Sequence, residues 1–208
     1  MSERVVIVDV GVGNLRSVEK AVAEAGKDLG LVPVRTAELD VIRKADRLVV
    51  PGQGEFRELI QRLGPERLEL LGERIRSGTP YFGICVGMQI LFAASEEAPG
   101  VPGMGVLPGT VRRLQGGPGL KIPHMGWNQL EFRGGGHPFL TENSWFCFMH
   151  SYHCVPDEAG VIRAVASYGP NQVTAAVARD NLFATQFHPE KSQIAGLSLL
   201  RNFLSSSG

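Results

Sequence analysis

Cys85 lies between two glycines, where a strand-like apolar run gives way to a helix-like one. Residues 83–87, GICVG, match the G-x-nucleophile-x-G elbow, in which small residues let the chain turn sharply from strand into helix. At such a turn a helix N-terminus stabilises a thiolate, and free N–H groups from Val86 onward can stabilise an oxyanion. The pattern indicates a nucleophile, although five residues alone leave open a buried cysteine with glycines that serve only packing.

A second stretch, FATQFHPEKS at 183–192, supplies groups that a cysteine nucleophile needs. Such a nucleophile requires a base, and the base requires a group that fixes its tautomer and orientation. His188 and Glu190 fit these roles, because residues two apart on an extended chain project to the same side and Pro189 favours that conformation at His188. The alternative is a surface loop that merely carries a histidine and a glutamate.

Alternating strand-like and helix-like segments in the first half must position these residues. Apolar runs are each followed by a turn and a helical pattern, which predicts an α/β fold with a mostly parallel central sheet flanked by helices. The carboxyl ends of such strands border the usual crevice for a site, and Cys85 and His188 both fall there. The expected strand and helix pairs are 4–10 with 14–26, 31–36 with 38–45, 47–50 with 55–63, and 80–85 with 86–95, with one more helix between Pro65 and Gly78.

The second half has a different pattern. Short strand-like segments separated by Gly, Pro and Asn predict additional antiparallel strands that extend the sheet, closed by a final helix. We therefore expect one domain spanning residues 1–208. The segments are 109–114, 127–132, 145–152, 161–168, 173–180 and 182–187, and the helix is 193–204.

Charge and cysteine content restrict the possible partners and the location. The chain has 21 basic and 21 acidic side chains among 208 residues, so no electrostatic footprint for nucleic acid or an anionic membrane is visible. Three cysteines are an odd number, which favours a reducing, cytoplasmic location over a disulfide framework. The N-terminus is interpreted as a buried strand rather than a signal peptide, and the longest apolar stretch, 81–94, is too short to span a bilayer.

A metal site is a rival interpretation of the histidines. The pattern C-x2-H-x2-H-C at 147–154 could bind zinc on composition alone. The flanking residues predict strands, however, and period-two alternation would send Cys147 and His150 to opposite faces, so we expect no metal. His124 and His137 lie beside prolines in turn-rich sequence and are expected to be structural or surface groups.

The motifs together resemble a known enzyme family. GICVGMQ followed about a hundred residues later by HPE is similar to the triad-type class I glutamine amidotransferases. Relatives in that class that feed GMP, anthranilate or carbamoyl phosphate synthesis usually have histidine at the position of Met88. Over essentially the whole chain the closer similarity is to the glutaminase subunits of imidazole glycerol phosphate synthase, at DVGVGNLRSV (9–18), PGQGEF (51–56), PHMGWN (123–128) and HSYHC (150–154).

The resemblance implies a role for each residue of the triad. Cys85 attacks the side-chain amide of glutamine, His188 protonates the leaving ammonia and then activates water, and Glu190 holds His188. The products are glutamate and ammonia, and no cofactor is needed. A tyrosine is common in the family where this chain has Cys147, which puts one hydroxyl contact of that family in doubt.

The resemblance also implies how the substrate is held. The turn PGQG (51–54) is the oxyanion strand, whose N–H near Gln53 or Gly54 completes the hole begun by Val86. Because glycines flank Gln53, that peptide could turn over, so we expect an isolated chain that is nearly inactive until its partner is loaded. The implied substrate-binding residues are Gly52, Gln89, Ser151 and Tyr152.

The implied partner is a (β/α)8-barrel cyclase subunit in a heterodimer. It would receive the ammonia and make imidazole glycerol phosphate and an aminoimidazole carboxamide ribotide, a step in histidine biosynthesis. About 18 residues follow Glu190, so we expect the acceptor to be a docked partner. Trp127, Asn128 and Lys191 are the expected docking residues. The alternatives are a free-standing cysteine hydrolase (a peptidase or γ-glutamyl hydrolase), a catalytically silent binding module and a zinc-stabilised interaction domain.

Overall fold

The computed structural model describes residues 3–206, so both ends of the expected domain, residues 1–2 and 207–208, lie outside the described residues. Its centre is an eight-stranded sheet in the order β2-β1-β3-β4-β13-β12-β11-β8. The first five strands in that order are parallel to one another, and each of the other three runs antiparallel to the strand before it. These strands are β1 (Val5–Val8), β2 (Val34–Thr36), β3 (Arg47–Gly52), β4 (Tyr81–Cys85), β8 (Glu131–Phe132), β11 (Ile162–Tyr168), β12 (Asn171–Arg179) and β13 (Leu182–Thr185).

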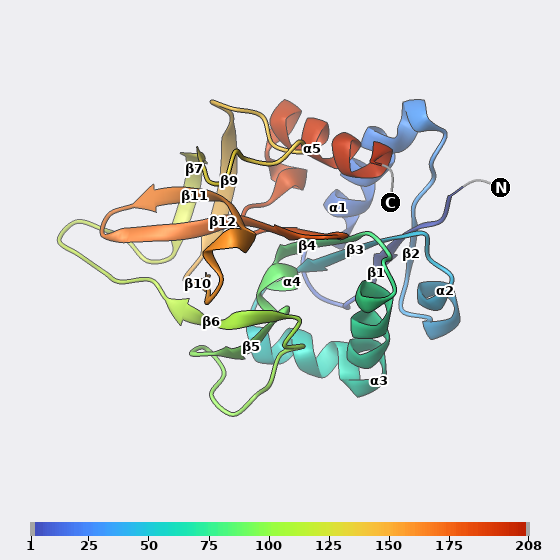
Figure 1. Cartoon of the computed structure of the whole chain (residues 1–208), viewed down its shortest axis with the longest axis horizontal. Coiled ribbons are helices and arrows are strands. Elements are labelled where there is room, and N and C mark those ends of the chain that lie inside the picture. The colour runs from blue at the N-terminus through green and yellow to red at the C-terminus, as the bar shows by residue number, and fades with distance from the viewer. Residues whose placement is uncertain (1–2, 207–208) are drawn as a thin grey trace.

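Helices cover both faces of this sheet, as the sequence predicts. In Figure 1 the contacting helices α1 and α5 lie on one side of the parallel strands, and α2 and α3 lie on the other. The apolar side chains of strands and helices join in one buried cluster. The helices are α1 (Leu15–Gly26), α2 (Leu39–Arg43), α3 (Phe56–Arg76), α4 (Val86–Gln89) and α5 (Gln193–Ser205), with 3-10 turns η1 (Lys27–Leu29), η2 (Ala159–Val161) and η3 (Pro189–Lys191).

The long segment α3 consists of two helices, as expected from Pro65. Gly64 has φ 70° and ψ 166°, which is not helical, and the second helix starts at the proline that follows. Proline is favoured at a first helical position because its missing N–H has no intrahelical partner there. None of the helices within residues 3–206 is both long and apolar enough to cross a membrane.

The prediction of a ten-residue helix after Cys85 is wrong. Only Val86–Gln89 is helical, and the chain then forms strand β5 (Phe92–Ser95). The intervening Ile90 and Leu91 are fully buried, as is Phe92. A short run that is apolar on all sides has no polar face, so periodicity cannot distinguish helix from strand.

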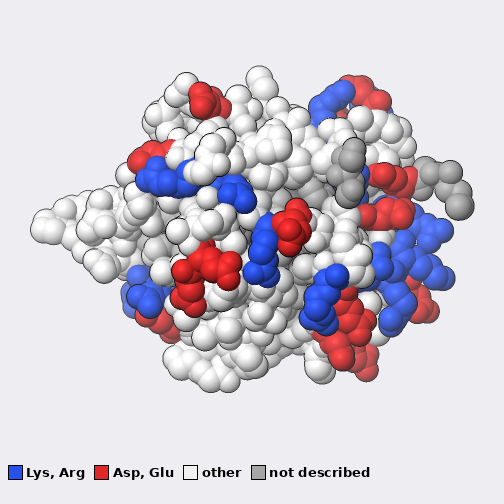
Figure 2. Space-filling view, viewed as in Figure 1, with Lys and Arg blue, Asp and Glu red and all other residues white. Residues whose placement is uncertain are grey.

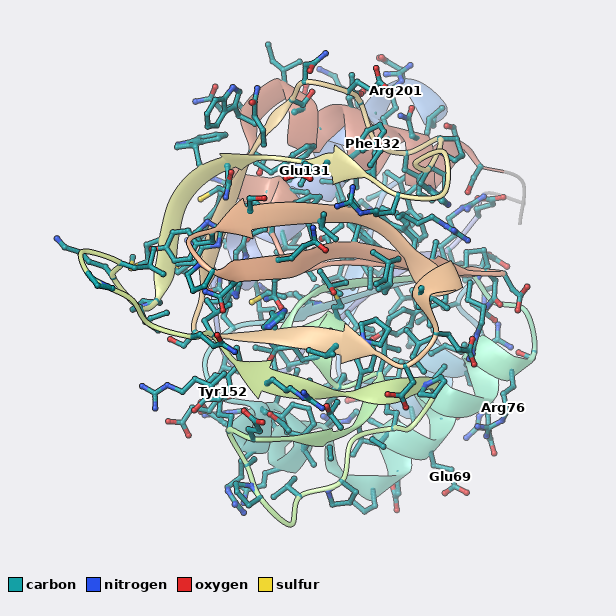
Figure 3. The ribbon with its side chains drawn as sticks, turned by 60° about the vertical axis from the view of Figure 1, so that its left-hand side comes forward. Glu69, Arg76, Glu131, Phe132, Tyr152 and Arg201 are labelled. Carbon is teal, nitrogen blue, oxygen red and sulfur yellow. The ribbon has the colours of Figure 1, made fainter. Side chains whose placement is uncertain are left out.

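The antiparallel segments do not all extend the central sheet, which corrects the sequence-based expectation. Strands β6 (Leu107–Arg113) and β10 (Tyr152–Pro156) form a three-stranded sheet with β5, and β7 (His124–Gln129) pairs with β9 (Trp145–His150). Figure 1 shows these small sheets at the end of the molecule away from both termini. Figure 3 shows Glu131 and Phe132 on β8, at the edge of the central sheet. The segment 150–152 connects the two small sheets, because it joins the end of β9 to the start of β10.

Candidate active site

Cys85 occupies a strained turn at the end of β4. Its backbone angles are φ 55° and ψ −109°, values that residues other than glycine rarely adopt, and only 4% of its surface is exposed. A Cβ atom on Gly83 would lie 2.6 Å from the carbonyl oxygen of Gly87, and one on Gly87 would lie 2.0 Å from that of Val50. Both glycines are therefore required by close backbone contact, and the elbow geometry expected from the sequence is present.

The turn after Cys85 is a single helical turn of four residues. A macrodipole builds up over several turns, so the dipole expected from the sequence is largely missing. Stabilisation of negative charge must come from the local N–H groups. The end of β3 supplies a second set of such groups, because Gly52 pairs with Cys85 and Gly54 follows with φ 88°.

His188 and Glu190 form a buried ion pair beside this turn. The Nδ1 atom of His188 lies 2.8 Å from Oε1 of Glu190, and both side chains are 1% exposed. His188 is extended (φ −102°, ψ 97°) as Pro189 predicts, while Glu190 lies in η3 rather than on a strand. Within residues 3–206, Nε2 of His188 and Oε2 of Glu190 are buried without a hydrogen-bond partner. The ring is thus fixed through Nδ1, which leaves Nε2 for proton transfer.

Electrostatics favour the protonated form of His188. Burial lowers its pKa, but attraction by the sulfur of Cys85 and by the carboxylate of Glu190 outweighs that effect and raises the pKa to about 10. At neutral pH the ring therefore favours the imidazolium form. This is the form that can donate a proton to a leaving amine.

A pocket of about 50 Å³ brings most of the predicted site residues together. Glu190 and Gly52 line a neighbouring cavity on the other side of His188, next to the loop before α1. Tyr152 lies at the start of β10 (Figure 3). The predicted residues that line the first pocket are Gln53, Gly54, Cys85, Val86, Gln89, Ser151, Tyr152 and His188.

Two residues of the site were missed by sequence reasoning. Glu97 lines the pocket and accepts a hydrogen bond of 2.8 Å from the backbone N–H of Phe56, and burial raises the pKa of its carboxyl group. Gln186 is completely buried and donates to the sulfur of Cys85 at 3.5 Å. An amide within the apolar run FATQF was the available signal for Gln186, whereas the pair Glu96–Glu97 in a turn carried none.

Trp127 lies on the surface rather than in the core. It is 46% exposed, and Trp145 and Ile194 beside it are 52% and 84% exposed. We call these three residues the tryptophan patch; they border an open hollow of about 400 Å³ between β7, β9 and α5. Asn128 and Lys191 are partly exposed. Figure 2 shows positive and negative side chains intermixed on one face, without a large field of one sign.

Ser192 connects this patch to the His188–Glu190 pair. It borders the hollow, its hydroxyl donates to the carbonyl oxygen of His188 at 2.6 Å, and the N–H of Cys147 donates to that hydroxyl at 3.0 Å. The N–H of His188 donates in turn to the carbonyl oxygen of Cys147 at 2.9 Å. The backbone of His188 is therefore hydrogen-bonded directly to β9 beneath the tryptophan patch.

The stretch 147–154 was also considered as a metal site. On β9 the buried side chains of Phe146, Phe148 and His150 alternate with partly exposed Cys147, so the expected alternation is confirmed. No three His, Cys, Asp or Glu side chains within residues 3–206 are grouped where they could hold a metal ion. His124 is buried at the start of β7, which agrees with a structural rather than a surface group.

Comparisons with known proteins agree with this geometry. The family "Glutamine amidotransferase class-I" matches residues 6–206. The imidazole glycerol phosphate synthase subunit HisH of Thermosynechococcus vestitus is 45% identical over 96% of this chain and 95% of its own length. The same subunit of Methylococcus capsulatus is 44% identical, with coverage of 96% and 95%.

Solved structures show the same fold at low sequence identity. A glutamine amidotransferase crystal structure superposes with a TM-score of 0.70 at 24% identity, covering 96% of each chain. A glutamine amidotransferase from Methylobacillus flagellatus gives 0.58 at 17% identity, covering 91% of this chain and 70% of the other. With the elbow cysteine and the His–Glu pair in place, the chain belongs to the class I glutamine amidotransferase family and, within it, to the HisH subunits of imidazole glycerol phosphate synthase.

Proposed function

We propose that this chain hydrolyses glutamine at Cys85 and passes the ammonia to a cyclase subunit with a (β/α)8-barrel. That partner would make imidazole glycerol phosphate and an aminoimidazole carboxamide ribotide in histidine biosynthesis. The observation that carries the proposal is the strained cysteine, at φ 55°, beside the buried His188–Glu190 pair in a chain of the HisH family.

In the first half-reaction the sulfur of Cys85 attacks the carboxamide carbon of glutamine. The C–N bond breaks, the nitrogen takes the proton of the His188 imidazolium, and a thioester remains on the sulfur. Neutral His188 then removes a proton from water, which attacks the thioester and releases glutamate. Glu190 keeps Nε2 aimed at the reacting atoms throughout, because it occupies Nδ1 at 2.8 Å.

The negative oxygen of each tetrahedral intermediate lies between two backbone segments. The N–H of Val86 follows the nucleophile directly, and the turn at Gln53 and Gly54 lines the same pocket. Glutamine is held by Gln89, Ser151 and Tyr152, which line this pocket, whereas Gly52 lines the neighbouring cavity and supports the turn at Gln53. Glu97 contributes an acidic side chain to the lining of the pocket, so it is the group suited to bind the α-ammonium of the substrate.

The cyclase docks on the tryptophan patch and on Asn128 and Lys191. Exposed tryptophans are typical anchors of protein interfaces, and the patch lies directly over the backbone that carries His188. Residues 1–208 act as one cytoplasmic domain that needs no cofactor of its own.

The test is glutamine hydrolysis by the chain alone and after addition of the cyclase and its nucleotide ligand. A switchable oxyanion donor is worth about 10²–10³ in kcat, so we expect the loaded complex to be at least about 10²-fold faster than the isolated chain. Full activity of the isolated chain would refute the switch. Hydrolysis of peptides or γ-glutamyl peptides without stimulation by a cyclase would instead support a free-standing hydrolase.

A further inference from the structure

Two buried histidines are in contact beside the substrate pocket: His124 on β7 and His150 on β9, which lines the pocket. Nδ1 of His124 is 3.0 Å from Nε2 of His150, and the two rings are 2% and 6% exposed. The ring of His124 is stacked between Phe148 and Tyr168, with centroids 4.7 Å and 4.0 Å away. The proposed mechanism uses neither histidine.

The contact between His150 and the backbone of Tyr152 fixes the proton positions in both rings. Nδ1 of His150 lies 2.8 Å from the carbonyl oxygen of Tyr152, which can only accept, so Nδ1 carries the hydrogen. In a neutral ring Nε2 is then an acceptor, and the hydrogen between the rings belongs to Nδ1 of His124. This leaves Nε2 of His124 as an acceptor.

The contact between His124 and Asn128 requires the same proton positions. The amide of Asn128 donates to the carbonyl oxygen of Ser167 at 2.9 Å, and its oxygen accepts from the N–H of Gln129 at 2.9 Å. Its nitrogen is thereby fixed toward Nε2 of His124, at 3.4 Å. A proton added to either ring would set one N–H against another. Burial acts in the same sense, because it lowers the pKa of His124 to about 4 and that of His150 to about 3.

The network continues from Tyr152 to the nucleophile. The carbonyl oxygen of Tyr152 also accepts from Nε2 of Gln89 at 3.1 Å. That amide donates to Oε1 of Gln186 at 3.2 Å, and Gln186 donates to the sulfur of Cys85 at 3.5 Å. One backbone carbonyl therefore receives hydrogen bonds from both the docking side and the catalytic side.

We propose that His124 and His150 are positioning residues for glutamine hydrolysis. As a neutral, directed pair they hold the carbonyl of Tyr152, and through it they set the segment 150–152 and Gln89 at the correct distance from Cys85. The inference rests on the proposed function, because it takes this segment as part of the glutamine site. Loss of the pair frees the carbonyl to rotate, so it weakens the binding of glutamine rather than the chemistry at sulfur.

The first test is His124→Phe in the complex with the cyclase. Phenylalanine preserves the stack on Phe148 and Tyr168 but removes both hydrogen bonds of the ring. The KM for glutamine should rise about tenfold or more, while kcat and synthesis from ammonium salts change less than about threefold. The matched control is His137→Phe, since His137 is also stacked, on Phe183 at 4.6 Å, but lies outside the network. It should leave the KM unchanged.

A second pair of variants separates hydrogen bonding from packing at His150. In His150→Asn the amide nitrogen lies near the former Nδ1 and can still donate to Tyr152, whereas His150→Leu cannot. The asparagine variant also loses the bond to His124, so its KM should match that of His124→Phe within about threefold, and the leucine variant should have a clearly higher KM. Equal KM values for Asn and Leu, or a normal KM in His124→Phe, would overturn the positioning role.

Folding and function are tested in the same series. If His124→Phe unfolds while His137→Phe remains folded, the pair acts on stability and the positioning role is refuted. Wild-type turnover with unaffected variants would refute that role alone. A wild-type complex that fails to hydrolyse glutamine would refute the proposed function together with it.

Discussion

Gly52 packs the end of β3 against the nucleophile elbow, so Gly52→Ala should separate the two sides of the oxyanion hole. A Cβ on Gly52 would lie 2.6 Å from the backbone nitrogen of Gly87 and 2.8 Å from side-chain carbons of Val86 and Leu59. Gly52 is not among the positive-φ glycines, so alanine can adopt its backbone and the effect is steric alone.

The size of the effect follows from these distances. The strand must move by about 0.8 Å to bring the 2.6 Å contact to the 3.4 Å of an ordinary contact. A donor about 2.9 Å from the oxyanion would then be about 3.7 Å away, beyond hydrogen-bond range. Loss of one such donor costs about 10²–10³ in kcat, and overpacking costs about 1–3 kcal/mol of stability.

The assay is glutamine hydrolysis by the ligand-loaded complex, with ammonium-dependent synthesis and thermal unfolding measured in parallel. Gly116→Ala is the matched control, because no atom lies within 4 Å of its missing Cβ and its φ is ordinary. Alkylation of Cys85 by a small reagent should persist in Gly52→Ala. A folded Gly52→Ala complex with kcat within about threefold of wild type would refute the placement of the oxyanion strand.

Three further predictions concern the base, the docking surface and pH. His188→Ala should cost at least roughly 10²–10⁴ in kcat, and Glu190→Gln should cost less because its amide oxygen can still accept from Nδ1; the reverse order in steady-state rates would make Glu190 the base. Trp127→Ala should fold, since the side chain is exposed, and should weaken cyclase binding by about 2 kcal/mol or more in a titration; an unfolded variant or unchanged affinity would contradict this. The pKa of His124 is lower in the folded than in the unfolded chain, so the stability that neutral His124 contributes is fully present above the unfolded pKa and is lost as the pH falls. From about pH 7.5 to 5.5 the unfolding free energy of the wild type should therefore fall by about 1 kcal/mol more than that of His124→Phe. Equal losses would refute a neutral His124.

The sequence was sufficient to predict the sharp turn at Cys85 and the pairing of His188 with Glu190. Gly83 and Gly87 are needed for close backbone contacts, and Pro189 keeps His188 extended, so these local requirements leave a pattern in the chain. Where the environment is apolar on all sides the pattern is lost, which is why Phe92 was assigned to a helix and lies in a strand.

Long-range contacts explain what the sequence did not predict. Gln186 reaches Cys85 across 101 positions, and the amide in its apolar run shows that it is unusual but not which residue it contacts. The exposure of Trp127 depends on pairing of β7 with β9 in a separate small sheet. The predicted strand began at Trp127, whereas β7 begins at His124, whose ring stacks on Tyr168 and contacts His150.

Glutamine hydrolysis by the Cys85→Ala complex tests whether Cys85 is the nucleophile. The variant should bind the cyclase and support synthesis from ammonium salts at the wild-type rate, because only the nucleophile is removed. We expect no glutamine-dependent turnover above background. Substantial glutamine hydrolysis by Cys85→Ala in the loaded complex would contradict it.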